Sequence, residues 1–369
     1  MLQLRQRGGI ATWFAFDRKI SLYGCGYRYE GLYSVLYYLS VMLLCTFVSK
    51  KYKKYLVNCI LICGGFQAIY GVCQSYNWLH VKQYFHTTKQ FDETTRTIVK
   101  GKRLWIVGLT NNPNFFGTYM SFCLAYSLGL LLDSKKIVKG IVYCLLSMLF
   151  LYAMLLSNTT SAAVGIIVTL LIIIIYSIKN KEFKKLCVIG VVLVCVTTIA
   201  YKQGKTRLIK DIHKTGIEAT EIAKGNLDES YGTDRMFIWK ETAKIIPNHF
   251  WHGVGIDSFH KAFNGTALIK KTKTRTVLYD KAHNEYLQIL ITYGIFGFVA
   301  YVWLYGYAVF CGIRRCFKYN EVYLILPIVC YLVQAFFNIS VIEVAPLFFM
   351  TLGLCCGKMG DEEKKIDKV

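Results

Sequence analysis

Two side chains in this sequence could carry chemistry together, because each stands at the end of a predicted helix. Arg235 lies in the segment 233–246, whose apolar residues recur at helical spacing and which Pro247 follows. His283 directly precedes about 25 mostly apolar residues, so we expect it at or just before the first turn of a membrane helix. The positive end of a helix disfavours an imidazolium and favours anions. The pair could therefore bind an anionic group and accept a proton, although a snorkelling arginine and a structural histidine are the alternative interpretations.

The helix expected at 233–246 is amphipathic. Thr233 is a plausible N-cap. The apolar positions follow one another at spacings of three, four and three and form one stripe, made of Met236, Trp239, Ala243 and Ile246. A helix of this kind is expected to lie in the membrane interface.

A polar stretch with three asparagines opens a further membrane segment. Asn111, Asn112 and Asn114 surround Pro113, directly before about 20 mostly apolar residues. This pattern makes Asn114 a candidate substrate-binding residue at a broken helix start. The alternative is a simple helix N-cap formed by Asn112 or Asn114.

The hydropathy pattern predicts the scaffold for these residues, an all-α polytopic membrane protein. Of the 369 residues, 54% are hydrophobic and only 18% are charged. The apolar residues fall into blocks of roughly 15 to 25, close to the number that a helix needs to cross a bilayer. The nine expected spans are 31–48, 55–79, 112–132, 140–157, 163–178, 186–201, 283–313, 322–341 and 344–357. This pattern excludes a soluble enzyme, a disordered tail and a disulfide-knotted secreted module.

The distribution of charge orients the predicted helices. Lys and Arg are dense in short connections such as 49–54 and 179–185, which places these connections in the cytoplasm. The net charge of +22 is then a topology signal plus a basic outer surface, and we expect no nucleic-acid partner because no binding motif accompanies it. The predicted organisation is an extracytoplasmic segment 1–30, a six-helix region 31–201, one long extracytoplasmic loop 202–282, a three-helix region 283–357 and a cytoplasmic tail 358–369.

Several familiar catalytic patterns are absent. The sequence has no HExxH, GxSxG or Walker loop and no DxD pair. Its 14 cysteines lie mostly in or beside predicted spans and do not form a disulfide framework. Ionisable groups are rare in the spans, unlike those of ion-coupled transporters. We therefore expect chemistry without a metal or another cofactor, at the outer boundary of the membrane.

Three motifs follow one another across about 231–300. They are D-R-x-x-x-W at 234–239, G-V-G-I-D-S-F at 253–259, and H-N-x-x-L at 283–287 with Y-G-I-x-G at 293–297. This series resembles the O-antigen ligase/polymerase superfamily of bacterial membrane glycosyltransferases. The resemblance is looser at Asn112-Pro113-Asn114 and at the turn 157–163, and it is weak before residue 100. The outside N-terminus means either that one span has been missed or that the chain begins inside what was once an external loop. Members usually have ten or more spans, which fits a chain that is short at its N-terminus.

The resemblance implies a C-type glycosyltransferase fold in the bacterial cytoplasmic membrane, surrounded by membrane lipids and with its active site on the extracytoplasmic face. The donor would be a glycan on a polyprenyl diphosphate lipid, and the acceptor a sugar hydroxyl of a second glycan or of a lipid-anchored core. Transfer would invert the anomeric centre and need no metal. Carried over by motif, Arg235 binds the donor diphosphate and His283 deprotonates or orients the acceptor hydroxyl. Trp239 and Asn284, in the same motifs, are candidate substrate-binding residues.

The sequence departs from the family pattern in one turn. Many members carry an arginine in a Ser-Arg-Gly/Ala pattern there, and Thr160 occupies its place in this chain. Either another cation completes the diphosphate site, with Arg103, Lys205 and the candidate substrate-binding residue Arg207 available, or the chain is weakly active or inactive. A glycan-lipid transporter is the alternative from another class, and it predicts inverted repeats and a charged cavity between spans. Polymerase and ligase share these motifs.

Overall fold

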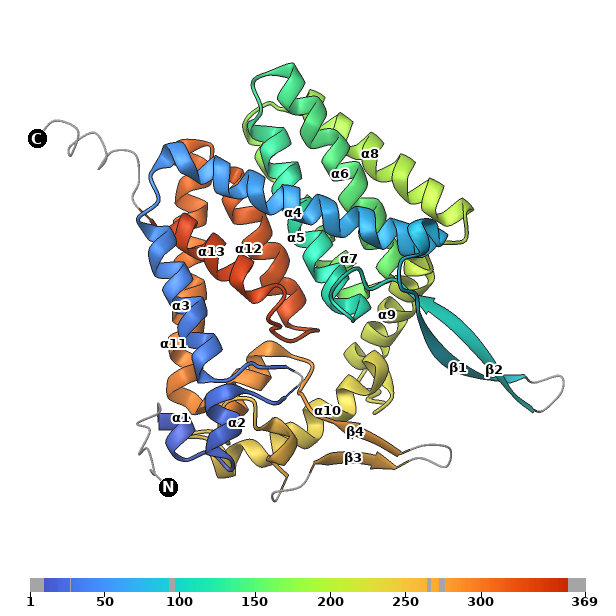
Figure 1. Ribbon diagram of the computed structural model, residues 1–369, viewed down its shortest axis with the longest axis vertical. Helices are drawn as coiled ribbons and strands as arrows, with labels where there is room; N and C mark the ends of the chain where they lie inside the picture. Colours follow the sequence, from blue (N-terminus) through green and yellow to red (C-terminus); the bar gives the residue numbers. More distant parts are fainter. Residues whose placement is uncertain (1–9, 27, 93–96, 264–266, 272–275, 358–369) are drawn as a thin grey trace, which may run out of the picture. The chain divides into compact units, whose positions relative to one another are not determined.

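The computed structural model describes residues 10–26, 28–92, 97–263, 267–271 and 276–357 and is built mainly from helices (Figure 1). The helices that coincide with expected spans are α3 (Leu32–Thr46), α4 (Lys50–Tyr76), α5 (Pro113–Asp133), α6 (Ile137–Ser157), α7 (Thr160–Lys179), α8 (Phe183–Lys202), α11 (Glu285–Tyr319), α12 (Val322–Ala335) and α13 (Ala345–Cys356). The remaining elements are α1 (Ile10–Trp13), α2 (Arg18–Tyr23), η1 (Trp78–His80), β1 (Tyr84–Asp92), β2 (Thr97–Trp105), α9 (Leu208–Ala223), α10 (Tyr231–Ile245), η2 (Ile246–His249), η3 (Phe259–Lys261), β3 (Leu268–Lys271) and β4 (Thr276–Tyr279).

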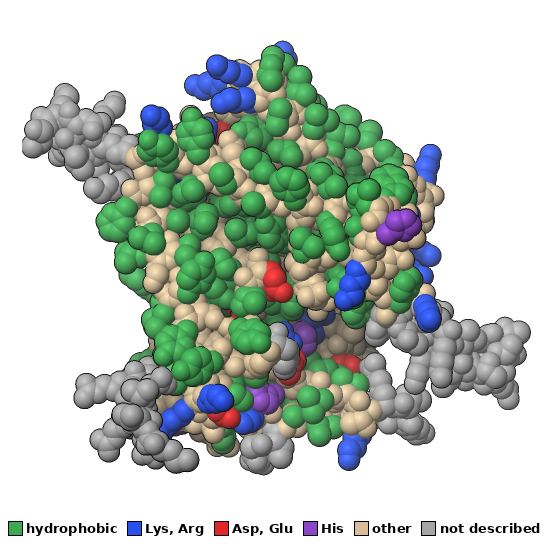
Figure 2. Space-filling view, viewed as in Figure 1, with side chains coloured by type: hydrophobic (Ala, Val, Ile, Leu, Met, Phe, Trp, Pro, Cys, Tyr) green, Lys and Arg blue, Asp and Glu red, His purple; other side chains and the backbone are tan. Residues whose placement is uncertain are grey.

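Six of the described helices are long and apolar enough to cross a membrane, namely α4, α5, α6, α7, α8 and α11. The apolar helices α3, α12 and α13 are shorter. Large hydrophobic side chains are exposed on many of these helices, for example Leu44 on α3, Ile137 on α6 and Val194 on α8, and hydrophobic side chains cover much of the face drawn in Figure 2. Apolar surface of this extent is typical of a membrane protein. The chain is therefore a multi-pass membrane protein.

The chain divides into two compact units. The first unit contains residues 1–50, 212–315 and 332–369, and the second contains residues 51–211 and 316–331. Arg235 and His283 both belong to the first unit, whereas Asn114, Thr160 and Arg207 belong to the second.

Helix α5 is the buried centre of the second unit. Its side chains are almost all buried from Phe116 to Leu132. Glycines let neighbouring helices approach it closely: a Cβ atom at Gly64 of α4 would lie 2.6 Å from the Cys123 sulfur, and a Cβ at Gly129 of α5 would lie 2.9 Å from the Tyr323 side chain of α12. Such close helix crossings are common in membrane proteins, where helices associate through van der Waals packing and small residues let their backbones approach closely.

The described part of the expected long loop 202–282 forms regular structure. It contains α9, α10, two 3₁₀ turns and the antiparallel hairpin β3–β4. A cluster of buried side chains joins the hairpin to α10 and to α11, and it consists of Ile238, Val254, Phe259, Ala262, Leu268, Tyr279, Ala282 and Ile291. The hairpins β3–β4 and β1–β2 are elements that an all-α prediction does not include, although they leave the fold mainly helical.

The N-terminal segment 10–30 packs on this loop. The backbone N–H of Phe16 donates to the Val254 carbonyl at 3.2 Å, and that of Ile256 donates to the Ser21 hydroxyl at 3.0 Å. Lys261 also pairs with Asp17 at 2.7 Å. The segment is therefore part of the first unit, held by residues more than 200 positions away in the sequence.

Helix α11 is broken at Gly294, a break that the predicted span 283–313 did not include. Gly294 has φ 73° and ψ −177°, a conformation open essentially to glycine alone. The Glu285 carboxylate accepts a hydrogen bond of 3.0 Å from the Tyr305 hydroxyl. In a straight helix these residues would be about 30 Å apart. The short arm 285–293 therefore folds back along the long arm that follows Gly294.

The glycine-rich loop after α10 explains why the break is stable. The N–H groups of Val254 and Gly255 donate to the carbonyls of Ile291 and Thr292, at 2.9 and 3.1 Å, where the short arm ends. The Ile295 N–H donates to the Phe250 carbonyl at 2.7 Å. The loop therefore satisfies the backbone groups that the break would otherwise leave unpaired.

We expect the substitution Gly294→Ala to destabilise the protein by about 2–4 kcal/mol, because an L-residue is strained in this conformation and its Cβ would lie 2.5 Å from the Trp251 carbonyl. The midpoint of thermal unfolding, followed by tryptophan fluorescence in detergent, measures the loss. Gly306→Ala on the long arm is the matched control, since its Cβ would meet open space, and alanine should be neutral or stabilising there. Equal midpoints for the two variants would contradict this account of the break.

Candidate active site

Arg235 begins the regular part of α10. The three residues before it, Gly232, Thr233 and Asp234, all have left-handed backbone angles, with φ between 62° and 68°. The prediction of Thr233 as the N-cap is therefore wrong, since an N-cap normally has an extended conformation. The Asp234 carboxylate fixes this turn to the hairpin, because it accepts from Lys270 at 2.9 Å and from the Tyr279 hydroxyl at 2.8 Å.

The guanidinium of Arg235 is held close to its own helix start. Its Nη1 donates to the Gly232 carbonyl at 2.8 Å. Its Nε is buried and has no hydrogen-bond partner among the residues that the structure describes. Burial lowers the pKa of this group, although a guanidinium stays charged at any physiological pH. A buried cationic donor without a partner carries a cost of about 1–3 kcal/mol or more, which an anion at this point would remove.

The buried face of α10 overlaps only in part with the predicted stripe. Ile238 and Thr242 are buried, whereas Ala243 of the predicted stripe is exposed. Ile238 belongs to the cluster shared with the hairpin, and Trp239 and Ile246 of the predicted stripe pack against that cluster. The predicted stripe is therefore wrong at Ala243.

Trp239 connects α10 to the segment that carries His283. Its indole N–H donates to the Ala282 carbonyl at 3.1 Å, and its ring lies edge-on to Phe336 at 5.5 Å. The indole is therefore a structural donor, which positions the residue directly before His283.

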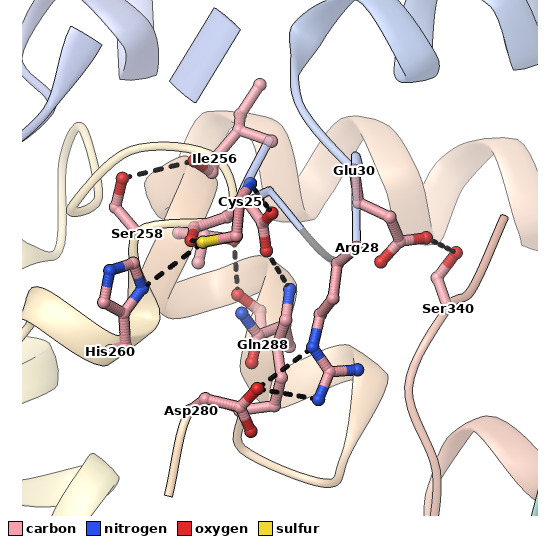
Figure 3. Close-up of polar contacts among 12 residues, drawn as sticks. Cys25, Arg28, Glu30, Ile256, Ser258, His260, Asp280, Gln288 and Ser340 are labelled. Atoms are coloured by element: carbon pink, nitrogen blue, oxygen red, sulfur yellow. Dashed lines mark hydrogen bonds and ion pairs between the residues drawn. The ribbon is translucent and has the colours of Figure 1, made fainter. Parts of the chain in front are cut away.

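Hydrogen bonds and ion pairs hold the residues on either side of His283. The Asp280 carboxylate accepts two bonds from Arg28 (Figure 3). Lys281 and Asp257, which are 4% and 3% exposed, form a buried ion pair. The Ala282 N–H donates to the Gln288 side chain at 2.8 Å.

Asn284 caps the short arm of α11. Its side-chain oxygen accepts from the Leu287 N–H at 3.1 Å, and its carbonyl accepts from the Gln288 N–H at 2.8 Å. His283 therefore lies one residue before the N-cap and has φ 50°. The expected position at a helix start is confirmed, but the helix is the short arm and not a full membrane span.

Burial lowers the pKa of the His283 imidazole to about 4, and the positive charge of Arg235 lowers it in the same direction. Arg28 and Lys281 add smaller effects of the same sign, and Asp280 opposes them. The imidazole is therefore neutral at neutral pH and can accept a proton. Sequence reasoning expected this state from the helix end, whereas burial and Arg235 are the main causes in the structure. The two predicted catalytic residues therefore interact electrostatically.

Replacing Asn284 separates capping from substrate contact. We expect Asn284→Ala to destabilise the protein by about 1 kcal/mol, the usual cost of a lost N-cap, and Asn284→Asp to recover most of that loss because aspartate also caps. Thermal unfolding measures both effects. If the Asp variant is stable but loses the activity of the protein, the amide itself is needed by a substrate, and capping does not account for Asn284.

Asn114 lies in the second unit, in the first turn of α5. The Asn112 side chain accepts from the Asn114 N–H at 2.8 Å, and Pro113 follows as the first helical residue. The alternative prediction of an N-cap at Asn112 is therefore confirmed. The Asn114 carbonyl accepts from the Thr118 hydroxyl at 2.8 Å, and its side chain is partly exposed.

The turn that departs from the family pattern also lies in the second unit. Thr160 is the first residue of α7. Asn158, with φ 54°, accepts from the Arg207 N–H at 2.6 Å. This bond brings the backbone of Arg207 to the turn, while the Arg207 side chain is exposed.

The other candidate cations differ in their surroundings. Lys205 donates to the Ser75 carbonyl at 2.9 Å and lies over the Tyr76 ring at 4.3 Å. Arg103 is in β2, and its side chain is outside the described part of the structure.

Four charged residues near His283 were missed by sequence reasoning: Arg28, Asp257, Asp280 and Lys281. Asp280 and Lys281 lie three and two residues before His283 in the sequence, and Asp257 belongs to one of the three motifs. Their sequence positions could therefore have marked them as candidate site residues. Arg28 gave none, because its contact with Asp280 joins residues 252 positions apart.

The fold is that of a helical multi-pass membrane protein. Its candidate site contains a cation, Arg235, that acts electrostatically on the neutral imidazole of His283. Residues 145–302 match the family model described as O-antigen ligase. The resemblance predicted from the motifs is therefore confirmed over this region, which includes Thr160, Arg235 and His283. The match indicates a membrane enzyme that joins glycans. No curated protein matches the chain.

Proposed function

We propose that this protein transfers a glycan from a polyprenyl diphosphate lipid to a sugar hydroxyl, as a polymerase or ligase of surface polysaccharide such as O-antigen. The acceptor is a second glycan or a lipid-anchored core. One observation carries the proposal: a buried guanidinium with an unpartnered Nε among the described residues acts electrostatically on a neutral imidazole. The family match supports the same function.

His283 and Arg235 have different roles in the proposed reaction. The acceptor oxygen attacks the anomeric carbon of the donor sugar, His283 takes the hydroxyl proton, and the bond from the anomeric carbon to the lipid diphosphate breaks with inversion. The leaving group carries away the bonding electrons, so negative charge accumulates on it. Arg235 neutralises that charge in a site from which water is largely removed, where a fixed cation counts most. The reaction needs no metal in this scheme.

The proposed topology has nine membrane crossings and a C-type glycosyltransferase bundle in the bacterial cytoplasmic membrane, with the active site on the extracytoplasmic face. The crossings include the shorter helices α3, α12 and α13. Contacts of segment 10–30 with the loop that follows α10 support the same side for both, as the charge pattern requires. The N-terminal segment and residues 202–282 then form the extracytoplasmic parts, and 358–369 the cytoplasmic tail.

The other candidate residues receive separate roles. Trp239 and Asn284 are proposed as positioning residues, because their polar groups bond the protein around His283. Asn114 and Arg207, which belong to the second unit, are proposed as substrate-binding residues. Thr160 stands where many family members carry an arginine. Arg207 is the proposed substitute for that arginine, since its backbone N–H is hydrogen-bonded to the turn before Thr160 and its side chain is exposed.

Reconstitution tests this function. The purified protein in lipid vesicles, supplied with a polyprenyl-diphosphate-linked oligosaccharide as both donor and acceptor, should form longer glycans and release polyprenyl diphosphate. The same preparation of His283→Asn should form neither product. Transport of the labelled lipid across the vesicle without a new glycosidic bond would contradict the proposal and favour a transporter. Neither bond formation nor transport by the well-folded protein would indicate an inactive family member.

A further inference from the structure

A groove lies between α4 and α6 in the second unit. Its volume is about 530 Å³, within the range of about 300–1,000 Å³ that is common for ligand sites. All the residues that line it belong to this unit. Two apolar stripes at helical spacing form its walls, with Ile62, Phe66 and Ile69 from α4 and Val138, Val142, Leu146 and Leu149 from α6.

Two adjacent glycines of α4 have different surroundings. Gly64 packs against α5, since its Cβ would meet the sulfur of Cys123. Gly65 lines the groove, and its Cβ would meet nothing within 4 Å. The wall side chains Phe66 and Val138 are 71% and 69% exposed. The described part of the protein therefore leaves this groove open to an occupant.

One part of the groove is polar and basic. The Tyr143 hydroxyl of α6 donates to the side-chain oxygen of Asn58 of α4 at 3.3 Å, and Lys139 lines the groove beside them. Lys135 and Lys136 precede α6 directly and are exposed, as Lys139 is. The remaining lining residues are apolar. The groove is thus charged near the start of α6 and apolar along the rest of its length, which is the polarity of an anionic lipid.

The length of the groove corresponds to one leaflet. The lined stretches 58–69 and 138–149 each rise about 16 Å along their helix, roughly half of a hydrocarbon core about 30 Å thick. Dense lysines place the connection before α6 in the cytoplasm, so in the proposed topology this leaflet is the cytoplasmic one.

We propose that this groove binds one anionic phospholipid, with an acyl chain along the two apolar stripes and the phosphate at Lys139. Burial of an acyl chain gives little selectivity in a membrane, because the surrounding lipid tails are equally apolar. The basic end therefore selects the ligand, as basic pockets between membrane helices on the cytoplasmic side do for anionic headgroups. Asn58 and Tyr143 are available to the ester groups below the phosphate. Arg235 and His283 belong to the other unit, so this lipid is additional to the substrates of the proposed reaction.

Competition between two lipids tests the site. The purified protein in detergent receives equal amounts of phosphatidylglycerol and phosphatidylcholine with the same acyl chains, and native mass spectrometry counts the lipids that it retains. We expect the wild type to retain one phosphatidylglycerol in preference to phosphatidylcholine. Lys139→Gln should weaken the binding of phosphatidylglycerol about fivefold, the factor that corresponds to about 1 kcal/mol for one lysine near an anionic headgroup, and leave that of phosphatidylcholine unchanged.

A second variant blocks the groove itself. Gly65→Leu places a side chain in the open space, and we expect it to abolish the selective retention of phosphatidylglycerol. Leucine is a better helix former than glycine and its Cβ meets no other atom, so the midpoint of thermal unfolding should not fall. If this variant does not fold, the substitution of the exposed Lys139 decides the test alone.

Helix α8 provides matched controls for both variants. Lys184 is exposed near the start of α8, and Gly190 of the same helix also has no atom within 4 Å of its Cβ. Neither residue lines the groove. Lys184→Gln and Gly190→Leu should therefore retain phosphatidylglycerol as the wild type does.

Three results would overturn the inference. The first is equal retention of both lipids by the wild type, which would mean that the groove holds ordinary bilayer lipid. The second is a preference for phosphatidylglycerol that survives Lys139→Gln and Gly65→Leu, or that the controls lose equally. The third is a dimer of the wild type that Gly65→Leu dissociates, which would make a second copy of the chain the occupant. The measurement needs no turnover, so it decides the lipid site whether or not the protein transfers glycans.

Discussion

Replacing His283 lowers the rate of glycan transfer about 10²–10⁴-fold, which is the usual contribution of a positioned general base. The acceptor hydroxyl is a poor nucleophile until its proton is removed, and the imidazole is neutral and available because burial and Arg235 keep its pKa near 4. His283→Asn is the informative variant, since asparagine tolerates the positive φ of this position but does not accept a proton. Formation of glycosidic product per enzyme, with donor and acceptor saturating, measures the loss.

An exposed histidine is the control for this substitution. His213 lies on α9 and is exposed, so His213→Asn should transfer glycan at the wild-type rate. The unfolding midpoint of both variants should stay close to that of the wild type. Wild-type turnover by a correctly inserted His283→Asn would exclude the histidine as the base.

The dependence of kcat/KM on pH also tests the role of His283 as the base. The base is active when deprotonated, so kcat/KM should fall as the pH drops through the pKa of the free enzyme, near 4. An ordinary histidine would give this limb near 6.5.

Removal of the Arg235 guanidinium should reduce transfer by on the order of 10²–10³-fold, because the diphosphate leaving group then develops its charge without a fixed cation. Arg235→Ala tests the charge. Arg235→Lys keeps the charge but not the forked donor geometry, and should retain part of the activity. The substitution to alanine also removes a positive charge beside His283, so the acidic limb of kcat/KM should move to higher pH.

Lys244 on the same helix is the control cation. It is exposed and pairs with Glu241 at 2.6 Å, so Lys244→Gln should change neither the rate nor the pH profile. If Arg235→Ala retained full transfer, or if its acidic limb stayed where that of the wild type lies, the proposed contact between guanidinium, leaving group and imidazole would be wrong.

The sequence was sufficient to predict most helices of the fold. Blocks of apolar residues between Lys-rich connections define segments whose ends agree with those of the helices within about six residues, because the length of a membrane helix is set by the bilayer. The break at Gly294 was not predictable in the same way. The surrounding residues are apolar on both sides, and the break depends on backbone bonds from residues 250–255, which hydropathy does not report.

In the candidate site too, local sequence patterns predicted some features, and others depend on contacts between residues distant in the sequence. Motif order pointed to Arg235 and His283, and the structure places both in one unit, where Arg235 lowers the pKa of His283. The N-cap at Thr233 and the stripe through Ala243 failed, because contacts of Asp234 with the hairpin and packing of Ile238 override local propensity. Arg28 was invisible to pattern reasoning, since its partner is distant in the sequence.

A double-mutant cycle on Arg235 and His283 tests the central claim most directly. Transfer rates are measured for the wild type, Arg235→Ala, His283→Asn and the variant with both changes. Since we hold that the two side chains serve a single step, the double variant should be only slightly slower than the worse single variant, because groups that act as a unit are strongly non-additive. A double variant whose loss equals the product of the two single losses would show that the residues act independently and would contradict a shared site.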